Sequence, residues 1–164
     1  MKLNNGKIAG VIITDNSNNT NVELEIKSRV VINATGAQTD TLRKELGKKP
    51  RIRPLRGSHL VIPGETLPLK RAVSFSHPLD KRPVYALPWE GVVIFGTTDV
   101  DNRDKSLTNP VISSDETKYL LTGLNHIFPD LKVDLKNIRC TFSGVRPIIN
   151  SASGNPSEIS REHA

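Results

Sequence analysis

Aromatic residues and cysteine are both scarce in this chain of 164 residues. Phe, Trp and Tyr together make up 4% of the sequence, so a hydrophobic core has to be built mainly from Val, Ile and Leu. The single cysteine, Cys140, excludes an internal disulfide and a cysteine-rich zinc site. Because its setting at residues 138–142 reads as a strand, we predict a buried structural thiol rather than a nucleophile. A chain of this kind suits a reducing cytoplasm.

Long hydrophobic runs are also missing from the sequence. The longest runs, such as residues 91–95, are far too short to span a bilayer, and the first residues do not form a signal peptide. His, Asp and Glu nowhere cluster at metal-ligand spacing, so we expect no metal site. With 36% hydrophobic and 24% charged residues, the composition is that of a globular domain with a real core.

Acidic residues are fewer than basic ones. The sequence has 23 Lys and Arg against 17 Asp and Glu, which gives a net charge of +6 and favours anionic partners. The basic residues are scattered and aromatic residues for stacking are few, so we do not expect the chain to bind nucleic acid. A small phosphorylated substrate or an anionic membrane surface fits the same charge.

The hydrophobic pattern predicts a mainly β chain. Strands are expected at residues 7–14, 22–27, 29–33, 58–63, 84–87, 92–95 and 138–143. The run at 29–33 is uniformly apolar, which is typical of a strand buried on both faces of a parallel sheet. Residues 83–96 are expected to form a hairpin around the turn-forming residues 88–91.

One principal helix is expected at residues 114–127. Ser113 and Glu116 have the spacing of a capping box, apolar residues recur at helical spacing, and Pro129 ends the run. A shorter helix is predicted from about Thr39. Strands come first, the best helix comes late and no internal repeat occurs, so the sequence predicts an α+β fold.

The C-terminal residues 150–164 are rich in Ser, Gly, Asn, Pro and charge, and we expect a loop or tail there. The sequence opens on a hairpin and ends in this polar stretch. We therefore expect the chain to be an internal segment of a longer protein.

Four segments carry a specific pattern. They are residues 30–37 (VVINATGA), 56–63 (RGSHLVIP), 94–99 (IFGTTD) and 141–147 (TFSGVRP). In this order and spacing they resemble the flavin-dependent glycerol-3-phosphate dehydrogenases of the D-amino-acid-oxidase-like superfamily, and the likeness continues to residues 159–161 (ISR). Enzymes of that family hold FAD and oxidise glycerol 3-phosphate to dihydroxyacetone phosphate. Many of them pass the electrons to quinone at the membrane.

The resemblance implies a domain organisation. Residues 1–47 would be part of the FAD domain, 48–149 the substrate-binding domain with an antiparallel or mixed sheet, and 150–164 a loop of that domain. The glycine-rich motif G-x-G-x-x-G that binds the dinucleotide is absent, as is the family's later Gly-Gly-Lys segment. Gln38 stands where the family usually has Trp. We therefore expect FAD to be the cofactor of the parent protein, and this chain alone to lack both bound FAD and activity.

Two arginines and a histidine are the candidate substrate residues. Arg146 lies between Gly144 and Pro147 where the predicted strand ends, and its planar guanidinium matches phosphate oxygens. The resemblance implies that Arg146 and Arg161 bind the substrate phosphate and that His59 faces the C2 hydroxyl as the catalytic base. The residues alone leave other interpretations open: Arg146 as a surface arginine paired with a carboxylate, Arg161 as a solvated loop arginine, and His59 as a half-buried structural histidine.

The turn of Ala34, Thr35 and Gly36 is implied to approach the flavin, although Gly36 also suits a tight exit from a strand. Residues 97–99 form a turn for which the sequence suggests no mechanism. His77 and His126 are interpreted as structural.

Two other functions stay open at this point. One is another FAD-dependent oxidase of the superfamily, acting on an amino acid or a 2-hydroxy acid, which would need a carboxylate clamp. The other is a basic binding module without enzymatic activity. For the parent enzyme we expect a cytoplasmic location, or attachment to the inner face of the membrane, with quinone or oxygen as electron acceptor.

Overall fold

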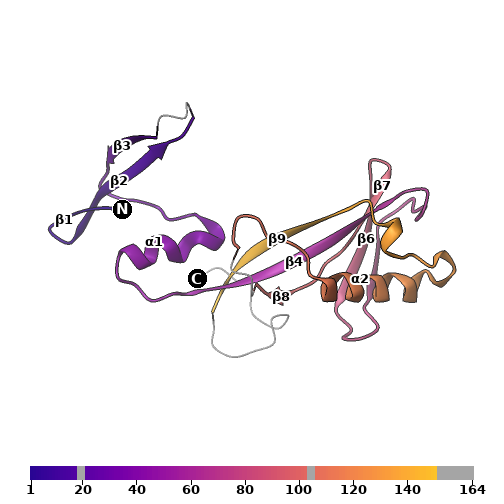
Figure 1. Cartoon of the computed structure of the whole chain (residues 1–164). Helices are drawn as coiled ribbons and strands as arrows, with labels where there is room; N and C mark the ends of the chain where they lie inside the picture. The colour runs from indigo at the N-terminus through magenta and orange to yellow at the C-terminus, as the bar shows by residue number, and fades with distance from the viewer. Residues whose placement is uncertain (18–20, 103–105, 151–164) are drawn as a thin grey trace. The chain divides into compact units, whose positions relative to one another are not determined.

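The computed structural model describes residues 1–17, 21–102 and 106–150 (Figure 1). The chain divides into two compact units, Met1–Ile52 and the part that begins at Arg53. Each unit is described by itself. The assignment of 1–47 to a flavin domain and 48–149 to a substrate domain stays a prediction.

The first unit is a small antiparallel sheet followed by a short helix. Its strands are β1 (Lys2–Asn4), β2 (Lys7–Asp15) and β3 (Val22–Lys27), in the order β1-β2-β3. A 3-10 turn, η1 (Gly36–Gln38), leads into α1 (Thr39–Glu45). The strands expected at 7–14 and 22–27 and the helix expected from Thr39 are confirmed.

The predicted buried strand at residues 29–33 is wrong. These residues form no strand, and the side chains of Val30 and Ile32 are 74% and 85% exposed. A parallel strand depends on hydrogen-bonding neighbours at its edges, and no described strand of the chain pairs with this segment. The apolar run therefore lies in a segment without regular secondary structure.

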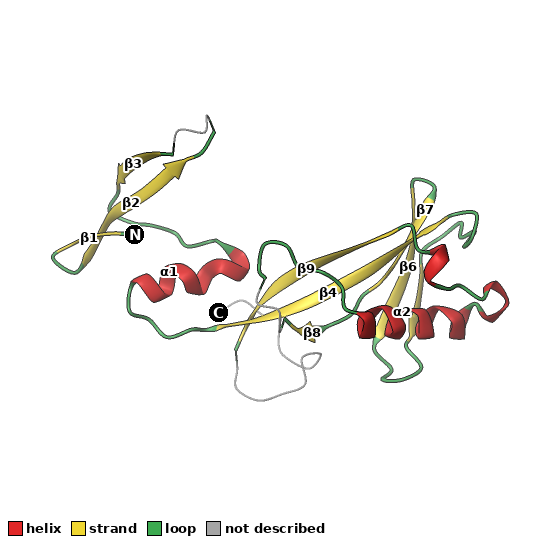
Figure 2. Cartoon of the chain, viewed as in Figure 1, coloured by secondary structure: helices red, strands yellow, loops and turns green. Residues whose placement is uncertain are grey.

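The second unit contains a twisted sheet with the strand order β5-β6-β7-β4-β8, and β9 also pairs with β4 (Figure 2). The strands are β4 (Ile52–Pro63), β5 (Val73–Ser76), β6 (Pro83–Trp89), β7 (Val92–Gly96), β8 (Val100–Asp101) and β9 (Cys140–Ile149). The pairs β4–β7, β4–β8, β5–β6 and β6–β7 are antiparallel. The hairpin predicted within 83–96 is confirmed. Its turn at Glu90 and Gly91 has φ of 42° and 82°, as tight hairpin turns require.

One long helix, α2 (Ser114–Ile127), covers one face of this sheet. Both halves of the predicted capping box are present, because the Ser113 hydroxyl accepts from the Glu116 backbone and the Glu116 side chain accepts from the Ser113 backbone. After the helix come two 3-10 turns, η2 (Pro129–Leu131) and η3 (Leu135–Asn137). The predicted start and end of the helix are confirmed.

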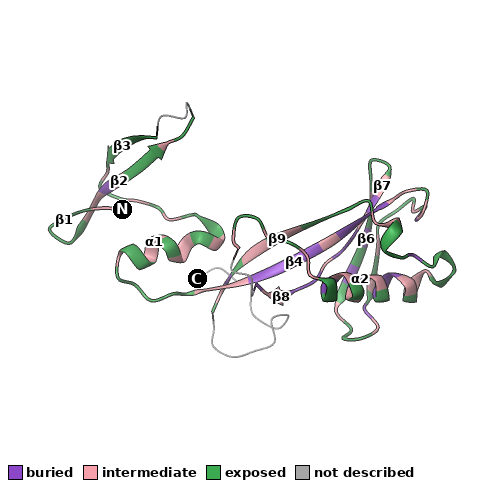
Figure 3. Ribbon diagram, in the orientation of Figure 1, coloured by how far each residue is buried: buried purple, intermediate pink, exposed green. Residues whose placement is uncertain are grey.

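The hydrophobic core of the second unit lies between α2 and the sheet. Its fully buried side chains alternate along the strands and include Leu60 and Ile62 of β4 and Phe95 of β7, packed with Leu120 and Leu124 of the helix. Burial is concentrated along β4 and β7 (Figure 3). This layer fixes β4 as the central strand, with one face toward the helix.

Strand β9 differs from the prediction in two ways. It does not end at Gly144 but continues through Arg146 to Ile149. Cys140, at its start, is exposed rather than buried. In β9 only Ile148 is buried, because the strand pairs with β4 at the edge of the helix-covered core and not within it.

Candidate functional site

Strand β4 separates two groups of polar side chains. Successive residues of a strand point to opposite faces. Arg56 and Ser58 reach Glu116 of α2 on one face. Gly57 and His59 lie on the other face. A single strand therefore connects the helix side of the sheet to the side that carries the predicted catalytic histidine.

Arg146 of β9 lies against the second of these faces. Its Nη1 donates to Asp99 Oδ1 at 3.1 Å and to the Thr98 carbonyl at 3.4 Å, and its Nη2 donates to Thr97 Oγ1 at 3.1 Å. The guanidinium lies directly over Gly57, where a Cβ would come within 2.2–2.5 Å of its atoms. The side chain remains 29% exposed. Arg146 is therefore held in one orientation and still accessible to a ligand.

His59 lies close to Arg146 on the same face. Its ring stacks on Phe142 with a centroid distance of 4.6 Å and an angle of 10°, and it covers Gly96, where a Cβ would lie 2.5 Å from His59 Cδ2. Its buried Nδ1 has no hydrogen-bond partner among the described residues. Burial, together with the positive charge of Arg146, lowers the pKa of His59 below 6.5. The imidazole is therefore neutral at neutral pH and able to accept a proton.

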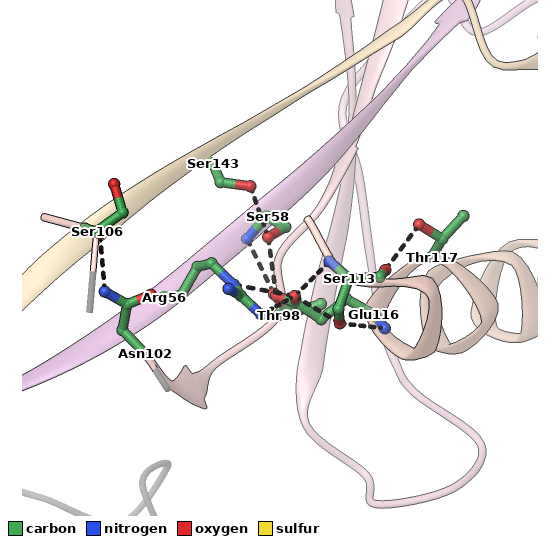
Figure 4. Close-up of polar contacts among 9 residues, drawn as sticks. All are labelled: Arg56, Ser58, Thr98, Asn102, Ser106, Ser113, Glu116, Thr117 and Ser143. Carbon is green, nitrogen blue, oxygen red and sulfur yellow. Dashed lines mark hydrogen bonds and ion pairs between the residues drawn. The ribbon is translucent and has the colours of Figure 1, made fainter. Parts of the chain in front are cut away.

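Glu116 is the centre of the polar group on the helix side (Figure 4). Its Oε1 accepts from Ser58 Oγ at 2.8 Å and from Thr98 Oγ1 at 2.7 Å. Its Oε2 accepts from Arg56 Nη2 at 2.7 Å and Nε at 3.0 Å. The same oxygen accepts from the backbone N and the Oγ of Ser113, both at 2.9 Å. One carboxylate thus joins the helix start, β4 and the segment that follows β7.

The Glu116 carboxylate is 4% exposed, and its Arg56 partner is 5% exposed. Burial by itself would raise the pKa of Glu116, but the hydrogen bonds, led by that from the Ser113 backbone, outweigh it and lower the pKa to about 2. The group is therefore an anion at every physiological pH. Breaking a buried ion pair of this kind leaves an uncompensated charge, which is strongly destabilising.

The sequence did not reveal what Glu116 or residues 97–99 do. Glu116 was interpreted only as half of a capping box. Asp99 was given no role, and it forms an ion pair with Arg146 at 3.1 Å. Of the two interpretations open for Arg146, the arginine paired with a carboxylate is present in the structure. A phosphate-binding role is compatible with that pairing because part of the side chain stays exposed.

The remaining predicted residues lie elsewhere. Arg161 is outside the described residues. Ala34, Thr35 and Gly36 belong to the first unit, where Thr35 Oγ1 donates to Asn33 Oδ1 at 2.8 Å. Gly36 has φ 58° and no atom within 4 Å of where its Cβ would be, so the turn needs glycine and leaves room beside it. The structure brings His59 and Arg146 together and does not place the turn relative to them.

His77 is completely buried and has a structural setting. Its ring stacks on Tyr119 at 3.7 Å between centroids, and its Nε2 lies 2.8 Å from the Tyr119 carbonyl. The ring also covers Gly123 of α2, where a Cβ would lie 2.5 Å from His77 Cδ2. His126 is exposed in the last turn of α2. Neither histidine lies in the group formed by His59 and Arg146.

A cavity of about 550 Å³ adjoins the N-terminal turn of α2, and Arg82, Asp115 and Tyr119 are among the residues that line it. Arg56, Thr98, Asp99 and Glu116 also line it, whereas none of the predicted site residues that the structure describes does. Within the described ranges, no group of three or more His, Cys, Asp or Glu is placed to hold a metal ion. The helices of the same ranges are all too short or too polar to cross a membrane.

The chain matches the family FAD dependent oxidoreductase (DAO) over residues 2–160. It therefore belongs to the DAO family of FAD-dependent oxidoreductases. This match confirms the expected superfamily.

Two curated relatives are aerobic glycerol-3-phosphate dehydrogenases. The protein of Bacillus subtilis (strain 168) is 35% identical over 159 residues, which cover 96% of this chain and 28% of the relative. The protein of Staphylococcus haemolyticus (strain JCSC1435) is 36% identical over 158 residues, covering 95% of this chain and 28% of the relative. The chain thus spans 28% of the length of these relatives.

Solved structures agree on the fold. The X-ray structure of the glycerol-3-phosphate dehydrogenase from Bacillus halodurans, complexed with FAD, superposes with a TM-score of 0.83 at 32% identity and covers 90% of this chain and 30% of that one. Glycine oxidase from Geobacillus kaustophilus gives a TM-score of 0.59 at 18% identity and covers 88% of this chain and 35% of that one. The predicted α+β fold of the superfamily is confirmed.

The residues present fit only part of an FAD site. The turn at residues 34–36 has exposed backbone and open space beside Gly36, so a flat ligand can approach it. The sequence contains no G-x-G-x-x-G turn to bind a pyrophosphate. The turn is therefore the part of the first unit that leaves room for a flavin, and the phosphates of the cofactor would be bound by other residues.

Proposed function

We propose that this chain carries the substrate-binding part of an FAD-dependent oxidoreductase that oxidises sn-glycerol 3-phosphate to dihydroxyacetone phosphate. The observation that carries the proposal is the placement of His59 and Arg146 on one face of β4, with Arg146 held by three polar contacts and still 29% exposed. The similarity at 35% identity to aerobic glycerol-3-phosphate dehydrogenases supports this substrate over other members of the family.

Arg146 binds the substrate phosphate. A guanidinium offers two parallel N–H donors that match phosphate oxygens, and charged hydrogen bonds of this kind are stronger than neutral ones. The contacts to Asp99 and Thr97 aim the side chain before substrate arrives. Arg161 provides the second arm of the clamp in this proposal.

His59 accepts the proton of the C2 hydroxyl. A bound FAD would supply the acceptor for the hydride that leaves C2. His59 is suited to its part because burial and the nearby Arg146 charge keep its pKa low, so the base is present in its neutral form. The Phe142 ring stacked on one side shields the imidazole from water and limits its rotation.

The electron acceptor and the location are also proposals. Quinone is the expected acceptor, with oxygen as the alternative, and the whole protein would act in the cytoplasm or on the inner face of the membrane. The isolated chain is expected to be inactive because it offers only part of a flavin site.

The phosphate clamp is tested with Arg146→Ala in the whole flavin-loaded protein. Loss of one bidentate partner should weaken substrate binding by about 2–4 kcal/mol, seen as a higher KM for glycerol 3-phosphate at normal flavin content. The matched control is Arg139→Ala, which removes an exposed arginine just before the start of β9 and should leave KM unchanged. An unchanged KM in the Arg146 variant would refute the clamp.

The base is tested with His59→Ala in the same protein. The turnover number should fall by roughly 10²–10⁴-fold with a smaller change in KM. In the wild type, the activity should fall as the pH is lowered below 6.5, because protonated His59 cannot accept the proton. The activity of the variant should not show this fall at acid pH. A normal turnover number would remove His59 from the mechanism and leave the clamp standing.

A further inference from the structure

Glu116 and Arg146 lie on different elements and do not contact each other, yet the same short segment joins them. That segment is residues 97–99, directly after β7. Thr98 Oγ1 donates to Glu116 Oε1 at 2.7 Å and accepts from the Ser58 backbone at 2.9 Å. The carbonyl of Thr98 and the side chains of Thr97 and Asp99 accept from Arg146. The segment is therefore fixed by Glu116 on one side and binds the arginine on the other.

A second route leads from Glu116 to the strand that carries Arg146. Ser58 Oγ donates to Glu116 Oε1 at 2.8 Å and lies 2.8 Å from Ser143 Oγ. Ser143 belongs to β9, the strand of Arg146. Figure 4 shows Ser58 between Glu116 and Ser143. The carboxylate thus fixes the segment that binds Arg146 and is linked to its strand.

The charge of Glu116 matters for this arrangement because every contact it makes is with a donor. Both oxygens accept, from Ser58 and Thr98 on one side and from Arg56 and Ser113 on the other. An amide of the same shape has one NH₂ group in place of an oxygen. Toward Arg56 that group would meet only donors, and toward the Ser58 and Thr98 hydroxyls it would reverse the direction of the hydrogen bonds, in a site that is 4% exposed and admits little water.

We propose that Glu116 is a positioning residue for substrate phosphate recognition: through Thr98 and Ser58 it holds residues 97–99 and β9 so that Arg146 stays aimed at the ligand. This inference rests on the proposed function for the identity of the ligand. The link between Glu116 and the orientation of Arg146 is independent of it and is tested without substrate.

The first experiment measures Arg146 directly in the isotopically labelled chain. In Glu116→Gln, the NMR signals of the Arg146 guanidinium should shift and broaden relative to the wild type. The ring of His59 should also titrate at higher pH, because a displaced Arg146 no longer opposes its protonation. Global destabilisation alone would not move either signal in the molecules that remain folded.

Further variants test whether the effect of Glu116→Gln comes from its contacts rather than from the loss of one negative charge or from misfolding. Asp115→Asn removes the same charge from the neighbouring, exposed residue of α2 and should leave both signals in place. Thr98→Val removes the hydrogen bond to Glu116 with little change in shape. If Glu116→Gln does not fold, Thr98→Val tests in its place whether this contact holds Arg146. Thr98→Ser keeps the hydroxyl and should restore the wild-type signals.

The second experiment is kinetic and uses the whole flavin-loaded protein. Glu116→Gln and Thr98→Val should raise KM for glycerol 3-phosphate by about 10- to 100-fold, the size expected of a small misplacement, with a much smaller effect on the turnover number. Folded variants with wild-type NMR signals and KM would overturn the inference. A wild-type protein without activity on glycerol 3-phosphate would overturn the proposed function, while the NMR result would still decide what Glu116 does.

Discussion

Glu116 should make the stability of the second unit sensitive to acid. The pKa of Glu116 is about 2 in the folded chain and 4.5 in the unfolded chain. Stability from this difference is fully present above pH 4.5 and is lost as the pH falls toward 2, with a total of about 3 kcal/mol. Denaturant unfolding measured from pH 6 down to pH 2 would show this decline.

The control for this prediction is Glu116→Gln. It should be less stable at neutral pH, and the decline between pH 4.5 and 2 should be shallower than in the wild type. Parallel pH curves for the two proteins would contradict the assignment.

His59 affects stability in a different pH range. Because its pKa is lowered in the folded chain, its contribution to stability is present above pH 6.5 and is lost as the pH falls below that value.

Single residues also show what the sequence can reveal about the site. His59 and Arg146 were identified through short motifs, and each lies within its motif. Glu116 was not, because its partners Arg56 and Ser58 are 60 and 58 residues away in the chain. A contact of that separation leaves no local pattern, whereas a capping box does, because its two residues are only three positions apart.

Helix α2 contains a glycine whose substitution should have an unusual effect. Gly123→Ala would normally stabilise a helix by up to about 1 kcal/mol. Here the new methyl group would lie 2.5 Å from the completely buried ring of His77, which stacks on Tyr119 and has no room to move. We expect the variant to be less stable by about 1–3 kcal/mol, as measured by thermal or denaturant unfolding.

Thr122→Ala is the matched control, since it changes the neighbouring, exposed position of the same helix. Its stability should stay within about 0.5 kcal/mol of the wild type. A stabilised Gly123→Ala protein would show that the helix and His77 are not in the close contact described.

The elements differ in how far local sequence determines them. Helix α2 was predicted with its true ends because all its signals are local: Ser113 caps its start, apolar residues recur along it, and Pro129 follows two residues after its end. Residues 29–33 have as clear an apolar pattern, but a strand exists only when another strand pairs with it, and none of the described strands does. Strand β9 extends past Gly144 because pairing with β4 continues beyond the residues that looked like strand.

At the scale of the molecule, the two units differ in their interiors. The second unit has a core of fully buried side chains from β4, β6, β7 and α2. Among the described residues of the first unit only Gly10 is buried, and Ile12, Ile13 and Leu24 are exposed. Composition could not distinguish these cases, because apolar residues occur in both units and only packing decides which of them form a core.

The purified chain is expected to be colourless. Its sequence has no glycine-rich turn that could bind the phosphates of the cofactor, and the exposed turn at residues 34–36 offers too few contacts to replace one. Absorption spectroscopy after addition and removal of excess FAD would measure any retained cofactor. A flavin band at stoichiometric occupancy would contradict this prediction.

The exposed thiol of Cys140 makes the protein convenient to observe. It is the single cysteine of the chain, and it lies on the surface at the start of β9, the strand that carries Arg146. A maleimide dye or a nitroxide would therefore attach at one known position without any engineered substitution. Fluorescence or electron paramagnetic resonance from that label would report on β9 as ligands are added.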